Sequence, residues 1–301
     1  MSRTSSTYPS KVNIFEVGPR DGLQNEATLL SVEDKVTFIQ ELILAGLKNI
    51  EVGSFVSPKW VPQMANSVAV CRALPKTPDV TFSGLTPNLR GLEEALAAGV
   101  DEIAIFGAAS ERFSQTNINC SVAESLLRFQ PVVALAQQHN IPVRGYVSTV
   151  LGCPYQGDVP IKDVLNVVKA LHDMGCYQIS LGDTIGVGTP LATQKLLDKI
   201  LELVPIEEVA VHFHNTYGQA LANILIALQM GISTIDTATA GLGGCPYAKG
   251  ASGNIATEDV VFMCHGMGID TGIDLAKLVT AGKNISQKLQ KQPHSLVSLA
   301  L

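Results

Sequence analysis

The chain repeats one pattern along nearly its whole length, and this repetition constrains the fold more than any other feature. Each repeat has a short run rich in β-branched residues, then a polar or glycine-containing segment, then a helical pattern of apolar residues. The predicted strands begin near Val12, Asn49, Val80, Glu102, Val143, Tyr177, Val209 and Thr234. The predicted helices cover residues 31–46, 62–74, 88–98, 120–139, 160–175, 189–203, 218–230 and 254–266. Eight such units without a long linker predict an α/β fold, the closed TIM (β/α)8 barrel.

An open, doubly wound sheet is the alternative arrangement for such a pattern. That fold usually carries a Gly-X-Gly-X-X-Gly turn after its first strand, whereas this chain has Gly18-Pro19-Arg20-Asp21-Gly22-Leu23 there. An additional C-terminal helix is predicted at about 274–291, where it could pack beneath the barrel or against a partner subunit. We therefore expect a flexible tail over residues 1–10 and one catalytic barrel domain with a C-terminal helical extension over residues 11–301.

The predicted helices carry recognisable start and stop signals. Ser31 is followed by Glu33 and Asp34, and Thr189 precedes Pro190, so each pattern places a capping residue before a helix. Glycines stand at the predicted helix ends at positions 46, 99, 175 and 231. A left-handed residue after a helix favours glycine, so we expect positive φ angles at these four positions.

The composition excludes several classes of partner. Lys and Arg number 21 against 27 Asp and Glu, a formal charge of −6 without a basic tract, so no nucleic acid partner is expected. No apolar run is long enough to cross a bilayer, so no membrane partner is expected. The six cysteines form no Cys-X-X-Cys pair, which indicates free thiols in a reducing compartment. The polar first ten residues are unlike a signal or transit peptide, so we expect a cytoplasmic location.

Two histidines on one predicted strand give the first indication of a site. Apolar residues alternate with the others over 209–214, so His212 and His214 leave the same side of the strand, about 7 Å apart along it. Such a pair could direct its ring nitrogens toward one metal ion, or it could be a hydrogen-bonded pair within the core. The residues at the other strand ends bear on this choice.

Polar residues gather at the predicted carboxyl ends of the strands, where barrel enzymes hold their active sites. Asp21 is the first choice as a carboxylate ligand beside the histidines, because strands one, seven and eight are neighbours in a closed barrel. Asn254 would add an amide oxygen, and without a cysteine pair a structural zinc site is disfavoured. The oxygen ligands suit Mg²⁺ or Mn²⁺, whereas imidazoles bind Co²⁺ or Zn²⁺ more tightly, so the identity of the ion stays open.

Five contiguous motifs, in order along the chain, carry a resemblance to a known enzyme family. They are residues 17–26 (VGPRDGLQNE), 54–64 (SFVSPKWVPQM), 182–186 (GDTIG), 212–218 (HFHNTYG) and 241–248 (GLGGCPYA). Together they resemble 3-hydroxy-3-methylglutaryl-CoA (HMG-CoA) lyases, and the likeness covers about residues 12–290. The Arg-Asp and His-X-His parts are shared with other metal-dependent lyases and Claisen-type synthases, whereas the second and fifth motifs point to this lyase.

The resemblance implies a retro-Claisen cleavage of HMG-CoA into acetyl-CoA and acetoacetate, assisted by a divalent cation such as Mg²⁺ or Mn²⁺. The cation would be held by Asp21, His212, His214 and Asn254, and it would bind the tertiary hydroxyl and one carboxylate oxygen of the substrate. Arg20 would stabilise the negative charge on the thioester oxygen, and Cys245 would protonate the enolate carbon. Glu51 and Asp183 both remain candidates for the base; Asp183 is favoured as base or proton relay and Glu51 as the partner of Arg20.

The resemblance also implies further contacts with the acyl-CoA substrate. Besides Arg20, the residues that match substrate-lining positions of the family are Gln24, Asn117, Tyr146, Ser180 and Thr184. One position departs from the family pattern, because members often carry Lys where this chain has Ala27, and a charged contact to the CoA part is therefore predicted to be missing. A homodimer is the expected assembly.

Two other functions compete with this prediction. A related 3-hydroxy-acyl-CoA lyase, or a Claisen-type synthase of the same barrel superfamily, would use the same carbon chemistry, although such synthases usually carry an extra regulatory domain. A barrel that binds a metal ion or CoA without turnover would be expected to have lost Arg20 or Cys245, and both are present.

Overall fold

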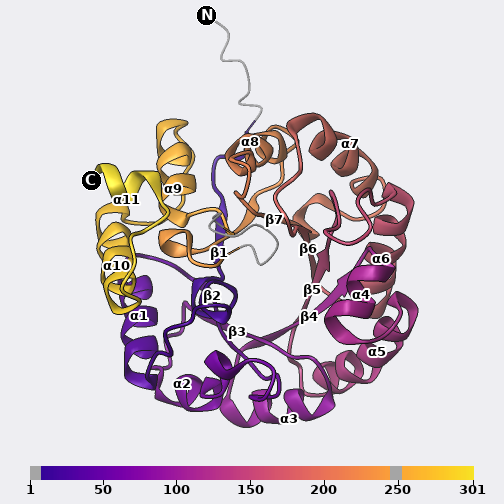
Figure 1. The fold of residues 1–301 in the computed structure, drawn as a ribbon, viewed down its shortest axis with the longest axis horizontal. Coiled ribbons are helices and arrows are strands. Elements are labelled where there is room, and N and C mark those ends of the chain that lie inside the picture. Colours follow the sequence, from indigo (N-terminus) through magenta and orange to yellow (C-terminus); the bar gives the residue numbers. More distant parts are fainter. Residues whose placement is uncertain (1–7, 245–252) are drawn as a thin grey trace, which may run out of the picture.

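The computed structural model describes residues 8–244 and 253–301. Within them, parallel strands β1 to β8 close into a barrel in sequence order, and β1 pairs with β8 (Figure 1). The strands are β1 (Asn13–Glu16), β2 (Asn49–Ser54), β3 (Thr81–Leu85), β4 (Glu102–Ala108), β5 (Val143–Ser148), β6 (Gln178–Asp183), β7 (Val209–Phe213) and β8 (Thr234–Thr237). Each strand begins within one residue of its predicted start, so the predicted TIM barrel is confirmed.

A ring of helices surrounds the barrel (Figure 1). These helices are α1 (Val32–Leu44), α2 (Ser67–Ala73), α3 (Leu89–Ala98), α4 (Glu111–Ile118), α5 (Val122–Gln138), α6 (Ile161–Met174), α7 (Pro190–Ile200), α8 (Ala220–Gln229) and α9 (Thr257–Gly266). Short turns are η1 (Gly18–Gly22), η2 (Pro62–Met64), η3 (Ile206–Glu208) and η4 (Thr239–Gly241). The turns η1 and η4 lie directly after β1 and close after β8, at the carboxyl ends of the strands.

The predicted start and stop signals of the helices are confirmed. The Ser31 side chain accepts a hydrogen bond from the Asp34 backbone, and the two residues form a complete capping box at the start of α1. Thr189 accepts from the backbone of Ala192 at the start of α7. The four glycines at positions 46, 99, 175 and 231 all have positive φ, as left-handed helix ends require.

Three helical segments differ from the prediction. The segment 62–74 is not one helix, because η2 is followed by a break and α2 begins only at Ser67, whose hydroxyl bonds the backbone of Met64 and of Ser54. The helix α4 was not predicted, since its only buried residues are Phe113 and Ser114 and it has no apolar stripe. The five-residue helix α11 (Leu296–Ala300) is too short to show a period of its own.

The predicted C-terminal helix is present as α10 (Leu275–Lys288), which lies against α1 in the outer ring (Figure 1). Its last residue, Lys288, forms an ion pair with Asp34 at 2.8 Å. Of the predicted tail, the structure describes residues 8–10, and the carbonyl of Ser10 accepts a hydrogen bond from the Asp270 backbone. No helix in the described part of the chain combines the length and the apolar character needed to span a bilayer.

Candidate active site

The turn η1 carries two of the predicted site residues, Arg20 and Asp21. It is a single π-helical turn directly after β1, a conformation that is rare and often found at functional sites. Its start is fixed because the backbone of Gly18 donates to Glu16 Oε1 at 2.8 Å. At its other end, a Cβ on Gly22 would lie 2.7 Å from the Cβ of Leu242, so only glycine allows the turn to approach the loop after η4 this closely.

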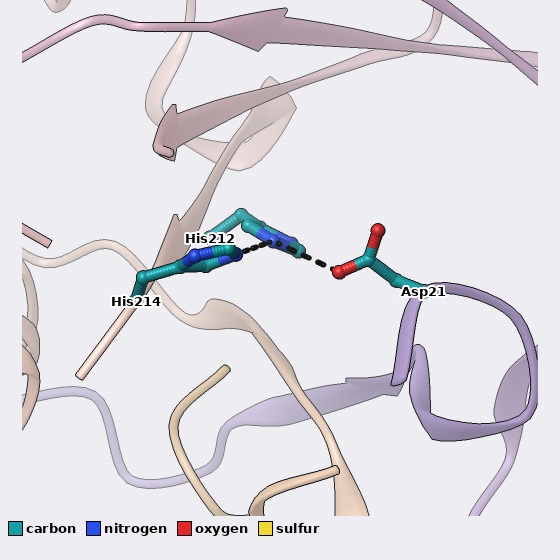
Figure 2. A group of neighbouring side chains, drawn as sticks. All are labelled: Asp21, His212 and His214. Carbon is teal, nitrogen blue, oxygen red and sulfur yellow. Dashed lines mark hydrogen bonds and ion pairs between the residues drawn. The ribbon is translucent and has the colours of Figure 1, made fainter. Parts of the chain in front are cut away.

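The two histidines and Asp21 come together at the barrel mouth (Figure 2). The Nε2 atoms of His212 and His214 are 3.3 Å apart, and His212 Nε2 lies 3.9 Å from Asp21 Oδ2. One ligand atom from each of the three residues lies within 4.8 Å of the others, a spacing that suits one metal ion. His212 and His214 leave the same side of β7, and β8 lies between β7 and β1 in the closed barrel. The cluster therefore lies where the sequence predicts it.

The charge states within this cluster favour metal binding. Burial opposes ionisation of Asp21, but Arg20 and the two histidines outweigh it and hold the pKa of this carboxyl below its usual range. Burial and then the adjacent His212 lower the pKa of His214, to about 4, against the opposing effect of Asp21. At neutral pH the cluster therefore offers an ionised carboxylate and a neutral imidazole, the states in which these groups act as ligands.

Asn254 lies against this cluster. It follows the segment after β8 and forms an isolated bridge with His214, which brings the two residues side by side. Its amide Nδ2 donates to Asp21 Oδ2 at 2.9 Å and to the carbonyl of Leu242 at 3.2 Å. All four predicted metal ligands are therefore neighbours in the structure.

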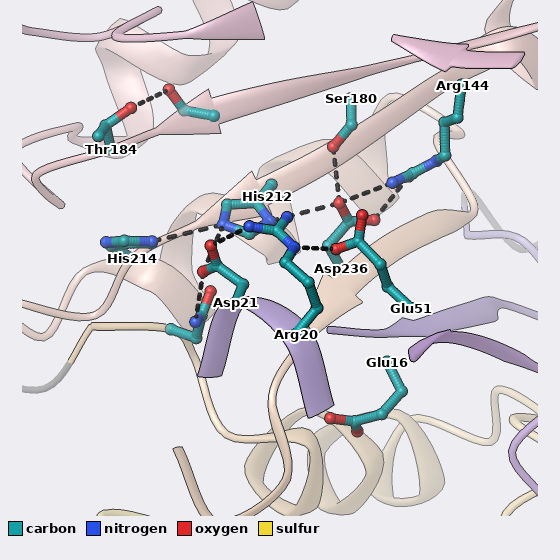
Figure 3. A network of polar contacts seen from close by, with 12 residues as sticks. Glu16, Arg20, Asp21, Glu51, Arg144, Ser180, Thr184, His212, His214 and Asp236 are labelled. Carbon is teal, nitrogen blue, oxygen red and sulfur yellow. Dashed lines mark hydrogen bonds and ion pairs between the residues drawn. The ribbon is translucent and has the colours of Figure 1, made fainter. Parts of the chain in front are cut away.

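Arg20 is buried beside the cluster and held by two carboxylates (Figure 3). Its Nε donates to Glu51 Oε2 at 2.5 Å, and one terminal nitrogen, Nη1, donates to Asp21 Oδ1 at 2.6 Å. The second oxygen of Glu51, Oε1, is buried without a hydrogen-bond partner among the described residues. The guanidinium is thus fixed at two of its nitrogens, while Nη2 has no acceptor in the described part of the chain.

Tyr146 and Ser180 face the barrel interior, from β5 and β6. The Tyr146 ring lies 5.6 Å from the Arg20 guanidinium and edge-on to the His212 ring at 6.1 Å. Its hydroxyl is buried, and no described residue hydrogen-bonds it. The Ser180 hydroxyl instead donates to Asp236 Oδ2 at 2.7 Å (Figure 3).

Asp183 and Thr184 stabilise the segment after β6. The carboxylate of Asp183 accepts from the backbones of Val187 at 3.2 Å and Gly188 at 2.8 Å, and burial raises its pKa to about 6. The Thr184 hydroxyl accepts from the backbone of Thr149 at 2.8 Å. Thr149 has a φ of +63°, which is rare for a β-branched residue and marks a strained backbone at this rim of the barrel.

The remaining predicted residues lie further out or outside the described residues. Gln24 is half-buried just after η1, and Asn117 is exposed near the end of α4. Within the described part of the chain, no hydrogen bond joins either of them to the Asp–His–His cluster. Cys245 lies outside the described residues, and Ala27 is exposed in the β1–α1 loop.

Sequence reasoning did not identify Asp236 and Arg144, which form a buried ion pair at 2.6 Å within the barrel. Although burial opposes ionisation of Asp236, Arg144 and His212 hold its pKa at about 2. Arg144 is the one charged residue of β5, and Asp236 is the one charged residue of β8. That pattern was the available signal, because an unpaired charge is rarely buried completely.

Two further buried acids support the turns that frame the site. Glu16 accepts from the backbones of Gly18 and Thr239, each at 2.8 Å, and therefore joins η1 to η4. Glu258, on α9, accepts from the backbone of Ala240 within η4 at 2.9 Å. Burial, together with the nearby carboxyl of Glu16, raises the pKa of Glu258 to about 8.

This raised pKa predicts how stability depends on pH. The folded chain holds a proton on Glu258 that the unfolded chain, with a pKa of 4.5, releases. The free energy of unfolding should therefore fall as pH rises from 4.5 to 8, by at most about 1.4 kcal/mol per pH unit from this group. The variant Glu258→Gln should flatten this dependence in urea unfolding at several pH values. The exposed control Glu207→Gln should keep it, and an unchanged slope in Glu258→Gln would contradict the assignment.

A closed (β/α)8 barrel with a buried arginine and an Asp–His–His cluster at its strand ends defines a class of enzymes whose catalytic mouth has a candidate metal site. Within that class, the chain belongs to the HMGL-like family, whose model matches residues 11–285.

Individual relatives agree with this assignment. A Pseudomonas aeruginosa protein named 3-hydroxy-3-isohexenylglutaryl-CoA/hydroxy-methylglutaryl-CoA lyase is 56% identical over 97% of this chain and 98% of its own length. The mitochondrial hydroxymethylglutaryl-CoA lyase of Pongo abelii is 55% identical over 98% of this chain and 90% of its own. The crystal structure of hydroxymethylglutaryl-CoA lyase from P. aeruginosa superposes with a TM-score of 0.96, at 55% identity and 98% coverage of both chains. The names of the relatives include mitochondrial and cytoplasmic enzymes.

Proposed function

We propose that this protein is a lyase that cleaves HMG-CoA into acetyl-CoA and acetoacetate by breaking the C2–C3 bond of the acyl group. Membership of the HMGL-like family and the names of its full-length relatives support the reaction. The observation that carries the proposal is the convergence of Asp21, His212 and His214 beside the buried Arg20. In this arrangement a candidate metal site, which would bind the oxygen atoms of a substrate, lies next to the fixed positive charge of Arg20.

A divalent cation, Mg²⁺ or Mn²⁺, fits the donor set. Asp21, His212 and His214 would hold it through one ionised carboxylate and two imidazoles. Asn254, whose Nδ2 donates to Asp21 in the structure, would turn its amide to add an oxygen ligand. When bound, such a cation supplies positive charge that orients the hydroxyl and carboxylate oxygens of the substrate and makes the hydroxyl more acidic.

Arg20 would stabilise the charge that develops on the leaving part of the substrate. Cleavage leaves the enolate of acetyl-CoA, with negative charge on the thioester oxygen. Nε and Nη1 of Arg20 are already bonded to Glu51 and Asp21, so Nη2 is the donor available to that oxygen. A donor positioned before the reaction stabilises the transition state without a cost of reorganisation.

Two proton transfers complete the reaction. A base takes the proton of the tertiary hydroxyl as the C2–C3 bond breaks and the new carbonyl of acetoacetate forms. Asp183 is our choice as base or relay, because burial raises its pKa to about 6, which allows it to exchange a proton near neutral pH. Cys245 would give its thiol proton to the enolate carbon of acetyl-CoA.

The substrate contacts differ in how much the geometry supports them. The unpartnered, buried hydroxyl of Tyr146 supports a contact with the substrate. Gln24, Asn117 and Thr184 are retained as contacts on the family resemblance alone. The hydroxyl of Ser180 is bonded to Asp236, which favours an indirect role.

We also propose an assembly and a location. The family resemblance supports a homodimer. The described cysteines are all free thiols, which supports a reducing compartment such as the cytoplasm.

A related substrate is the second candidate, and one observation favours it. The P. aeruginosa relative is named for a lyase of 3-hydroxy-3-isohexenylglutaryl-CoA as well as the hydroxymethyl substrate. Cleavage of an analogue with a longer C3 substituent, measured beside HMG-CoA, distinguishes the two specificities. Net condensation of acetyl-CoA with acetoacetate would instead support a synthase.

The test is an assay coupled to acetoacetate and acetyl-CoA, run with Mg²⁺ or Mn²⁺ and after EDTA treatment. We expect cleavage with either metal, a loss of about 10²–10³-fold or more after EDTA, and recovery when metal is returned. The variant His214→Ala should reproduce the loss, whereas His139→Ala, at the exposed end of α5, should not. Absence of cleavage with both metals would remove the proposal.

A further inference from the structure

Asp236 lies on β8 in the barrel interior, directly behind the Asp–His–His cluster (Figure 3). Its Oδ2 accepts from Ser180 at 2.7 Å and from Arg144 at 3.0 Å, and it lies 3.3 Å from His212 Nδ1. Its Oδ1 accepts a second bond from Arg144 at 2.6 Å. The Asp236 side chain is fully buried, and it touches a predicted metal ligand without belonging to the predicted ligand set.

Arg144 fixes this carboxylate in one orientation. The guanidinium is fully buried, and its two terminal nitrogens donate to the two carboxylate oxygens of Asp236. Its Nε donates to Gln178 at 2.9 Å. The rings of Phe15 and Tyr146 lie 4.1 Å and 5.0 Å from its central carbon. A bidentate pair held in this way leaves the carboxylate no freedom to turn from His212.

The contact with Asp236 determines which nitrogen of His212 carries hydrogen. A carboxylate paired with arginine only accepts hydrogen bonds, so Nδ1 of His212 must be the donor. In the neutral ring, Nε2 then has a free electron pair, and Nε2 is the atom that faces His214 and Asp21.

We propose that Asp236, held by Arg144, is a positioning residue that keeps His212 in the Nδ1–H tautomer, with Nε2 directed at the metal site. This inference rests on the metal site of the proposed function and adds the residues behind it. Outer partners of this kind orient the ligating imidazole and strengthen its binding of metal. If the Arg144–Asp236 ion pair were only structural, its loss would affect folding but would not change the tautomer of His212.

The first test uses the wild-type protein without metal. Long-range ¹H–¹⁵N spectra of the imidazoles at about pH 8 report which nitrogen carries hydrogen, and His212→Asn identifies the His212 signals by their loss. We expect the Nδ1–H form. The Nε2–H form would overturn the proposal, and this result does not depend on any Asp236 variant folding or on metal being bound.

The second test measures Mn²⁺ affinity, by electron paramagnetic resonance of free Mn²⁺, in Asp236→Asn. We expect the Kd to rise about 10–100-fold, the usual effect of losing such a partner. The matched control is Asp259→Asn, since Asp259 is also buried but accepts from Ser295 at 2.8 Å and from no residue of the cluster. It should lose stability in urea and keep its Mn²⁺ affinity within about twofold.

The outcomes separate this inference from the proposed function. A folded Asp236→Asn that binds Mn²⁺ like the wild type would overturn the positioning role and leave the lyase proposal intact. A wild type that binds no Mn²⁺ would contradict the metal part of the proposed function, while the tautomer of His212 still decides the role of Asp236. If Asp236→Asn does not fold, the wild-type tautomer alone decides it.

Discussion

Replacing Arg20 by lysine should lower kcat by about 10²–10³-fold, almost as much as replacing it by alanine, because the geometry of the guanidinium matters as well as its charge. In the structure one planar group bonds Glu51 through Nε and Asp21 through Nη1, and Nη2 has no acceptor among the described residues, which leaves it for the proposed contact with the substrate. A lysine side chain has one ammonium nitrogen, so it cannot replace all three guanidinium nitrogens, which point toward Glu51, Asp21 and the proposed substrate position. The loss should appear mainly in kcat, since the charge on the thioester oxygen develops only in the transition state.

The measurement is kcat and KM in the coupled assay with saturating Mn²⁺. Arg90→Lys is the matched control, because the Arg90 side chain is 87% exposed and its only described ion pair is with Glu94 on the same helix. That variant should match the wild type within about twofold, as expected for a surface pair. An Arg20→Lys enzyme that keeps more than a tenth of the wild-type kcat would contradict the assigned role.

The barrel was predictable because its signals are local. A capping serine, a left-handed glycine and a period of two or 3.6 residues each depend on a few neighbours, and together they predict the start of each strand to within one residue. The segment 62–74 shows the limit of this reasoning. Its helix is broken after Met64, where Asn66 bonds the backbone of Leu30 and accepts from Lys35, tertiary contacts that local periodicity does not contain.

The residues of the site likewise fall into those that local patterns predict and those that only the closed barrel brings together. His212 and His214 were predictable because strand alternation puts them on one side, and closure of the barrel brings Asp21 to them. Asp236 and Arg144 were missed because they are 92 residues apart in sequence and meet only inside the closed barrel. A charged residue within a predicted barrel strand indicates that a partner must exist, but not which strand supplies it.

The variant Cys245→Ser separates metal binding from proton transfer. The resemblance assigns this thiol to protonation of the enolate carbon, and the described cluster of Asp21, His212 and His214 is complete without it. A serine hydroxyl is a much weaker acid than a thiol, so turnover should fall by about 10²–10⁴-fold, the usual contribution of a general acid. Mn²⁺ affinity should stay within about twofold of the wild type.

Two measurements on each protein decide this prediction: kcat in the coupled assay and the Kd for Mn²⁺. Cys71→Ser is the control for the chemical change itself, because Cys71 is a half-buried free thiol on α2, outside the proposed site. It should keep both values. If Cys245→Ser lost Mn²⁺ binding together with turnover, the thiol would belong to the metal site, and protonation of the enolate would have to come from another group. If it kept full turnover, the proton would not come from Cys245, and Asp183 would become the first candidate, since its raised pKa allows it to hold a proton near neutral pH.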